Sequence, residues 1–130
     1  MRIYRTLDEF SVAGHIAQLR SSESGALAVL ALAREGERLN ISVSIGALEL
    51  ALRLRYDEMV RQLELLTPQP GFVTTRHIGS GQAYMEVGMT QEQGLILRPT
   101  LASDATGHLT ANLVTTRAVF EALQTWLSNT

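Results

Sequence analysis

The side chains best suited to chemistry in this chain are its three histidines, and they lie far apart in the sequence, at His15, His77 and His108. None of them has a carboxylate or a second histidine at the helical spacing that a metal-binding motif requires. The chain contains no cysteine, so it has no thiolate nucleophile, no thiolate metal ligand and no disulfide. These residue types and spacings predict no metal site, no cofactor and no catalytic residues, and we expect a protein that is not an enzyme.

Two short segments carry reactive groups close together, and turn chemistry explains both. Residues 103–108 combine a hydroxyl, a carboxylate and an imidazole, but Asp104 can bond its own backbone and Gly107 accepts a positive φ, as turns require. Residues 79–81, Gly-Ser-Gly, lack the last glycine and the following helix of a dinucleotide-binding fingerprint. A phosphate loop of the glycine-lysine type is excluded because the chain has no lysine. We therefore predict that both segments are turns.

The eleven basic residues are all arginine, and some of them follow patterns that would suit nucleic acid. Arg53 and Arg55 share one face of a predicted strand, Arg98 lies in another strand, and Arg76 is near Tyr84 in sequence. A guanidinium group can pair with a phosphate or stack on a base, and a tyrosine ring can act as a stacking platform. These five residues are the predicted nucleic-acid-binding set.

The overall charge limits what such a set can do. Thirteen acidic residues outnumber the arginines and leave a formal charge of -2, so no global positive field attracts phosphate backbones. Any nucleic-acid binding must come from a local patch.

Hydrophobic residues make up 45% of the 130 residues, which suits one compact domain over 1–130. Apolar runs such as 26–33 are far shorter than a membrane helix, so we expect a cytoplasmic protein.

The first half of the chain reads as a strand meander followed by a helix. Residues 48–55 place leucine at every second position, and residues 39–45 alternate in the same way, which predicts two strands that each bury one face. Residues 26–33 predict a more fully buried strand before them. After Arg55 the apolar period becomes helical, with Asp57 and Glu58 in the first turn, so we expect a helix over about 57–66. Two prolines and a glycine within 67–71 end it.

The second half repeats this order. Residues 82–90, 94–101 and 108–114 alternate as strands, and a final helix follows. The two predicted helices carry apolar stripes sixty positions apart, Met59, Val60, Leu63 and Leu66 in the first and Val119, Phe120, Leu123 and Trp126 in the second. We therefore predict an α+β fold made of two tandem antiparallel strand-meander-plus-helix units, about 10–66 and 72–128, and we expect Trp126 to belong to the core.

The segment that leads each half has more than one interpretation. Residues 72–78 alternate as a fourth strand, and residues 10–16 alternate too. The first segment also fits a helix over 6–20, because Thr6 is followed three residues later by Glu9 in the form of a capping box. Strand and helix are both left open here, and they lead to different fold families.

If both leading segments are strands, the element order and the paired helical stripes resemble the Whirly-type fold. In that fold two such units pack as a pseudo-twofold pair of sheets. The resemblance implies binding of single-stranded nucleic acid on exposed sheet faces, and hence a nucleic-acid or transcription-associated role. If residues 6–20 are a helix, the order is similar to the small acidic dimeric chaperones of type III secretion. That resemblance implies a homodimeric adaptor with a protein partner, and fold alone does not choose between them.

Overall fold

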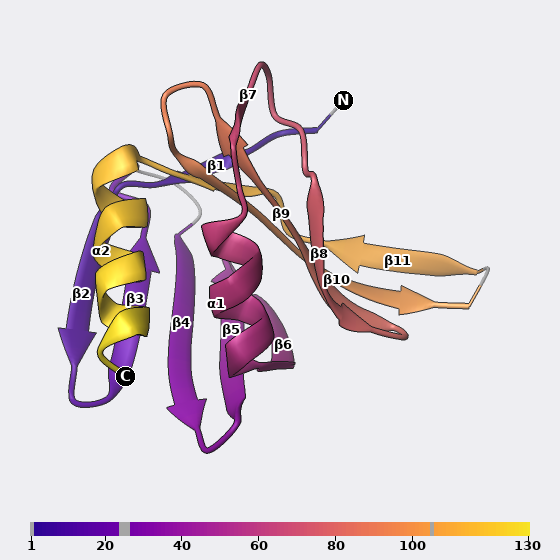
Figure 1. Cartoon of the computed structure of the whole chain (residues 1–130). Helices are drawn as coiled ribbons and strands as arrows, with labels where there is room; N and C mark the ends of the chain where they lie inside the picture. The colour runs from indigo at the N-terminus through magenta and orange to yellow at the C-terminus, as the bar shows by residue number, and fades with distance from the viewer. Residues whose placement is uncertain (1, 24–26, 105) are drawn as a thin grey trace.

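A computed structural model describes residues 2–23, 27–104 and 106–130 of the chain. Within these residues it has twelve strands in two sheets and two helices (Figure 1). The mixed α+β class predicted from the sequence is therefore confirmed. Neither helix in the described part of the chain is long and apolar enough to cross a membrane.

The first sheet is a five-stranded antiparallel meander in which sequence neighbours are also neighbours in space. Its strands are β2 (Glu9–Ala13), β3 (Ile16–Arg20), β4 (Ala28–Glu35), β5 (Arg38–Ile45) and β6 (Leu48–Arg55). Along β4, β5 and β6 every second side chain is buried, as the alternating sequence requires. One face of this sheet thus belongs to the core.

The second sheet has seven strands and takes its members from both ends of the chain. Its main path runs β1-β12-β10-β9-β7, with β11 beside β10 and β8 beside β9. The strands are β1 (Arg5–Leu7), β7 (Pro68–Gln69), β8 (Arg76–Ser80), β9 (Ala83–Thr90), β10 (Leu95–Ser103), β11 (Gly107–Thr110) and β12 (Leu113–Thr115). Because β1 pairs in parallel with β12, the N-terminal segment is part of the second half of the fold.

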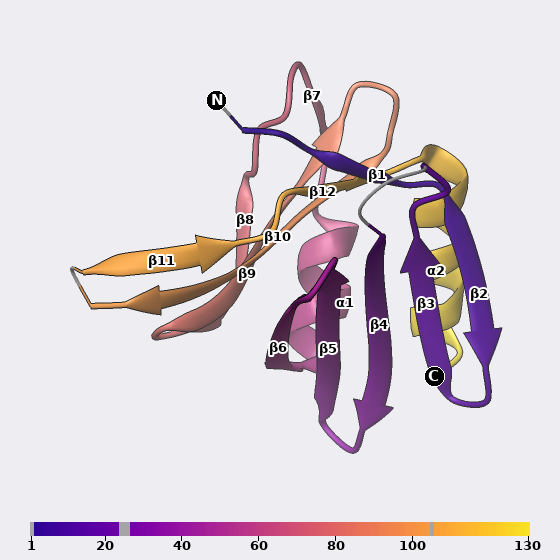
Figure 2. The ribbon, with the colours of Figure 1, turned by 180° about the vertical axis from the view of Figure 1, so that it is seen from behind.

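The two helices are α1 (Tyr56–Glu64) and α2 (Arg117–Ser128). The hydroxyl of Thr116 caps α2 by accepting a hydrogen bond from the Val119 amide at 3.3 Å. Both helices lie against the same face of the five-stranded sheet, and the view from behind shows that sheet in front of them (Figure 2). Within the described residues, no helix or strand covers the other face of this sheet.

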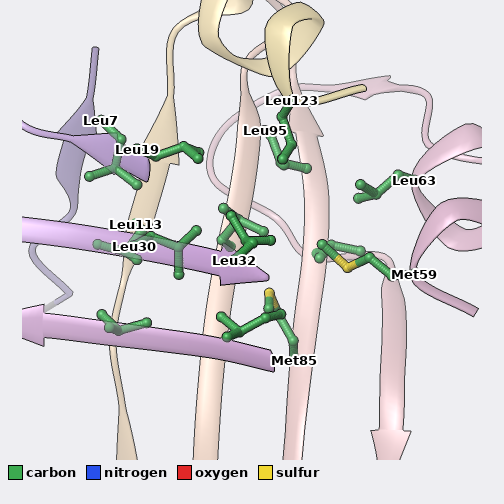
Figure 3. Close-up of a cluster of buried hydrophobic side chains, with 14 of the residues drawn as sticks. Leu7, Leu19, Leu30, Leu32, Met59, Leu63, Met85, Leu95, Leu113 and Leu123 are labelled. Carbon is green, nitrogen blue, oxygen red and sulfur yellow. The ribbon is translucent and has the colours of Figure 1, made fainter. Parts of the chain in front are cut away.

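The core fills the space between the two sheets and the helices. One buried cluster there includes Leu30 and Leu32 of β4, Met85 of β9 and Met59 of α1 (Figure 3). All four side chains are fully buried. Since each buried methylene contributes about 0.8 kcal/mol, this shared core is what holds the second sheet against the first.

Residues 6–20 form strands, so the helical interpretation of this segment is wrong. They contribute most of β1 and all of β2 and β3, with a turn at Gly14, where φ is +63°. The predicted capping box does not form. Asp8 instead accepts hydrogen bonds from the amide and the hydroxyl of Ser22, which closes the loop back from β3. The long-range pairing of β1 with β12 outweighs the local helix signal.

Several predicted boundaries also moved. The strand expected over 108–114 is split into β11 and β12, and the strand expected over 72–78 begins only at residue 76. Gly107, for which a turn with positive φ was predicted, is instead the first residue of β11 and has no positive φ. Ala26 of the predicted strand over 26–33 and Ala105 of the predicted turn lie outside the described residues. On α2 the predicted residues Val119, Phe120 and Leu123 are buried, but the last buried position is Leu127, and Trp126 is only partly buried against the core.

Candidate functional site

The outer face of the seven-stranded sheet carries a polar depression of about 290 Å³. We call it the β9–β11 depression. Its polar lining comes from Tyr84 and Glu86 on β9, Arg98 and Thr100 on β10, Asp104 in the turn after β10, and His108 and Thr110 on β11. Strand pairing explains why they meet, since Glu86 is directly opposite Arg98 and Thr100 is opposite both Tyr84 and Thr110. Residues two apart along a strand share a face. The alternate residues of β9 point the other way, into the core.

Arg98 is the charged centre of the depression, and its side chain is only 10% exposed. Its Nη1 lies 3.1 Å from Oε1 of Glu86, and its Nε donates to Oδ1 of Asn112 at 3.1 Å. A buried charge is tolerated only when it is paired and hydrogen-bonded, and these two partners meet that requirement. They hold the guanidinium plane in one orientation. Within the described residues its Nη2 donates to no protein atom, which leaves that edge available for a ligand.

A stacked ring pair lies beside this arginine. The rings of His77 on β8 and Tyr84 on β9 are parallel within 24°, with their centroids 4.5 Å apart. His77 is opposite Glu86 in the strand register, so the ring pair and the Glu86–Arg98 ion pair are adjacent on one sheet face. The His77 side chain is exposed and the Tyr84 side chain partly exposed. The pair therefore offers a flat aromatic surface next to the Glu86–Arg98 ion pair.

Hydroxyl groups and a second imidazole complete the outer end of the depression. The Thr100 and Thr110 hydroxyls are 3.0 Å apart, and Thr100 also donates to the carbonyl of Arg98 at 3.2 Å. His108 is exposed at the rim. These groups can donate or accept hydrogen bonds, so the depression presents both signs of hydrogen-bonding group around one cation.

The depression has a clear boundary along the strands. Next to the Glu86–Arg98 pair on the same face comes Gly88, where the backbone of Val73 and Thr74 crosses the sheet. The Thr75 amide donates to the Val87 carbonyl at 2.8 Å and fixes this crossing. The face is thus covered at Gly88 and open from Glu86 outward.

The structure brings together two of the five residues in the predicted nucleic-acid-binding set. Arg98 and Tyr84 both line the β9–β11 depression. Arg76 is exposed on β8, but its register with Val87 puts it on the opposite face from Tyr84. Arg53 and Arg55 lie on β6, in the other sheet. The five residues therefore do not form one patch.

The two arginines of β6 are paired with acids of this chain. Arg53 Nη2 lies 3.8 Å from Glu35, and Arg55 Nε lies 3.3 Å from Asp57. The hydrogen bond with Asp57 raises the pKa of Arg55, and the same bond lowers the pKa of Asp57. Exposed ion pairs of this kind are worth little in stability, but they reduce the positive field that β6 presents to a phosphate.

Sequence reasoning missed His77, Thr100, Thr110 and the positioning residue Asn112. The alternation of Arg98 and Thr100 along one strand was a signal for Thr100, because both must share a face. The stacking of His77 on Tyr84 had no such signal, since it depends on the register between β8 and β9. Within the described residues no three histidines, aspartates or glutamates gather as a metal site would need.

Comparison with known proteins adds no further constraint. No family model, no curated protein and no solved structure matches the chain. The geometry of the β9–β11 depression is therefore the basis for the functional conclusion.

Proposed function

We propose that this chain is a non-enzymatic binding protein that holds single-stranded nucleic acid on the outer face of its seven-stranded sheet. The observation that carries the proposal is the position of Arg98, fixed and almost buried, directly beside the exposed His77–Tyr84 ring pair. A nucleobase can stack on the rings while Arg98 Nη2 donates to the adjoining phosphate. The Thr110 hydroxyl and the His108 imidazole are placed to contact the sugar or the next phosphate.

The size of the depression suits a short contact. Ligand pockets usually measure about 300–1,000 Å³, and the β9–β11 depression is just below that range. We expect it to hold about one nucleotide of a longer strand. Stacking on one aromatic platform contributes about 1–3 kcal/mol per base, so binding should be weak and dominated by stacking.

The fold supports the same proposal through its resemblance to the Whirly-type arrangement. In each half of the chain consecutive strands lead into a helix, β4-β5-β6-α1 in the first half and β9-β10-β11-β12-α2 in the second. A Whirly-like pairing of these two units is part of our proposal, as is a transcription-associated role. The absence of cysteine from the sequence supports a cytoplasmic location.

Fluorescence anisotropy with labelled single-stranded DNA and RNA oligonucleotides tests the proposal. We expect Tyr84→Ala to weaken binding about tenfold, within the range that the loss of one stacking platform covers, and Tyr84→Phe to retain it. The salt dependence should be shallow, with a slope of about −0.7 in log K against log salt, because one phosphate contact is expected. A slope several times steeper would point to a larger basic surface than the depression offers.

Arg53→Ala is the matched control, because Arg53 is an exposed arginine on the other sheet. It should leave oligonucleotide binding unchanged while Tyr84→Ala reduces it. If the chain binds no oligonucleotide at low salt, or if Arg53→Ala weakens binding and Tyr84→Ala does not, the proposed function is wrong.

A further inference from the structure

The outer face of the five-stranded sheet is a second surface that no element of the described chain covers. Both helices lie on its inner side, so the sheet is in front of them when seen from behind (Figure 2). The middle of this face is a shallow hollow of about 400 Å³, lined in part by the small side chains of Ala31, Ala33, Ser42 and Ala51. A solvated sheet face normally carries many polar and charged residues. This one has small and mostly uncharged side chains at its centre.

Strand register arranges the face into four rows that run across the strands. The second row is Ser11, Gln18, Ala31, Ser42 and Ala51, and the third row is Ala13, Ile16, Ala33, Asn40 and Arg53. Among these ten residues only Arg53 is charged. The first row holds Glu9, Arg20 and Glu49, and the fourth holds Glu35, Arg38 and Arg55. An uncharged centre with a charged rim is the usual composition of a protein interface.

We propose that a second copy of this chain docks face to face on this surface. A two-fold axis relates the two copies; it lies between their two five-stranded sheets and runs perpendicular to the strands. Such an axis makes each strand face its own counterpart and sets the first row of one copy over the fourth row of the other. A two-fold interface uses the same patch twice, so the patch must complement itself. Both its charges and its shape do so.

The charges match at two corners of the interface, one at each end of β6, and the two-fold axis makes these corners equivalent. The axis sets Glu49 of one copy over Arg55 and beside Arg38 of the other. Arg38 and Arg55 are directly opposite each other on β5 and β6. Like charges in that position are destabilising, and a carboxylate between them offsets the repulsion. An axis along the strands would instead set Glu9 over Glu49, which is unfavourable.

The shapes match in the two central rows. The axis places Asn40 of one copy over Ser42 of the other, and Arg53 over Ala51, so that larger side chains enter the hollow above smaller ones. Arg53 Nε donates to Asn40 Oδ1 at 3.0 Å, and Asn40 Nδ2 donates to Glu35 at 2.9 Å. These bonds hold the larger side chains in place before association, which reduces the entropy lost on binding.

The area of the face sets the strength to expect. From standard strand spacing and rise, the five strands span roughly 500–600 Å² of sheet. A standard interface buries about 800 Å² on each partner, so this face is at the low end for a specific dimer. We therefore expect a monomer–dimer equilibrium that depends on protein concentration.

Sedimentation velocity over a range of protein concentrations tests this inference through charge reversal. Glu49→Arg alone and Arg55→Glu alone should each raise the dimer dissociation constant at least tenfold, because each sets like charges opposite one another at both corners. An equal mixture of the two variants should associate again, since the heterodimer regains an attractive pair at both corners. Glu121→Arg, on the exposed side of α2, is the matched control and should not change association.

Several results would overturn the inference. The wild-type chain could remain monomeric at every concentration, or the mixture could associate no better than the single variants. Dimers that survive both reversals would place the interface elsewhere. The outcome is separable from the nucleic-acid proposal, because Glu49 and Arg55 lie on the other sheet and their reversal should leave the Tyr84-dependent binding of oligonucleotides in place.

Discussion

Replacing Gly88 with alanine should test how the segment at residues 73–75 crosses the seven-stranded sheet. A Cβ at Gly88 would overlap the carbonyl oxygen of Val73, and it would approach the Cα of Thr74 to 3.0 Å. Both obstacles are backbone atoms, so no side chain can rotate away. The crossing segment would have to lift from the sheet, and the hydrogen bond from the Thr75 amide to the Val87 carbonyl would weaken with it.

The expected loss follows from these two effects. Overpacking of a tight site typically costs about 1–3 kcal/mol. A weakened backbone hydrogen bond adds about 1 kcal/mol. We therefore expect Gly88→Ala to lower the free energy of unfolding by about 3 kcal/mol, which for a domain of this size lowers Tm by about 10 °C.

Urea unfolding followed by fluorescence is a suitable assay, because Trp126 is the single tryptophan and is partly buried on α2. Gly107→Ala is the control, since a Cβ there meets no atom within 4 Å. It should change the free energy of unfolding by less than about 0.5 kcal/mol. If the two variants unfold at the same urea concentration, the backbone of residues 73–74 does not cross β9 at Gly88, and the proposed boundary of the depression is wrong.

Three further predictions concern local bonds. The hydroxyl and amide of Ser22 lower the pKa of Asp8 by hydrogen bonding to its carboxylate. These bonds therefore stabilise the fold at neutral pH, and their contribution is lost as pH falls through the lowered pKa. Ser22→Ala should raise the Asp8 pKa toward its ordinary value in an NMR titration. Tyr56→Phe removes the bond from the tyrosine hydroxyl to the Leu127 carbonyl and should destabilise the protein by about 1 kcal/mol in thermal unfolding. Thr116→Ala should also cost about 1 kcal/mol by removing the cap of α2, and Thr116→Ser should restore most of it.

Local periodicity predicted most individual elements correctly. The strand at residues 48–55 was placed with the bounds it has in the structure, because alternate leucines at Leu50, Leu52 and Leu54 leave one buried face and one exposed face. The first helix was placed within two residues at each end. Elements of this kind depend on neighbours in sequence, and the sequence contains that information directly.

The candidate site was less predictable. Arg98 and Tyr84 were named from their residue types, but Arg76 was grouped with Tyr84 although strand alternation puts the two on opposite faces. His77 was considered only as a metal-binding or catalytic candidate, with no role beside Tyr84. A stack between two strands depends on register, which the composition of either strand alone does not specify.

By itself, the sequence determined the α+β class, the alternating strands of the five-stranded meander and the excess of acidic over basic residues. Only the tertiary structure decided that residues 6–20 are strands, because the partner of β1 is β12, more than one hundred residues away. It also decided which polar residues meet. Arg98 is the centre of the site because the fold places Glu86 and Asn112 beside it. A nearly buried guanidinium group requires such partners.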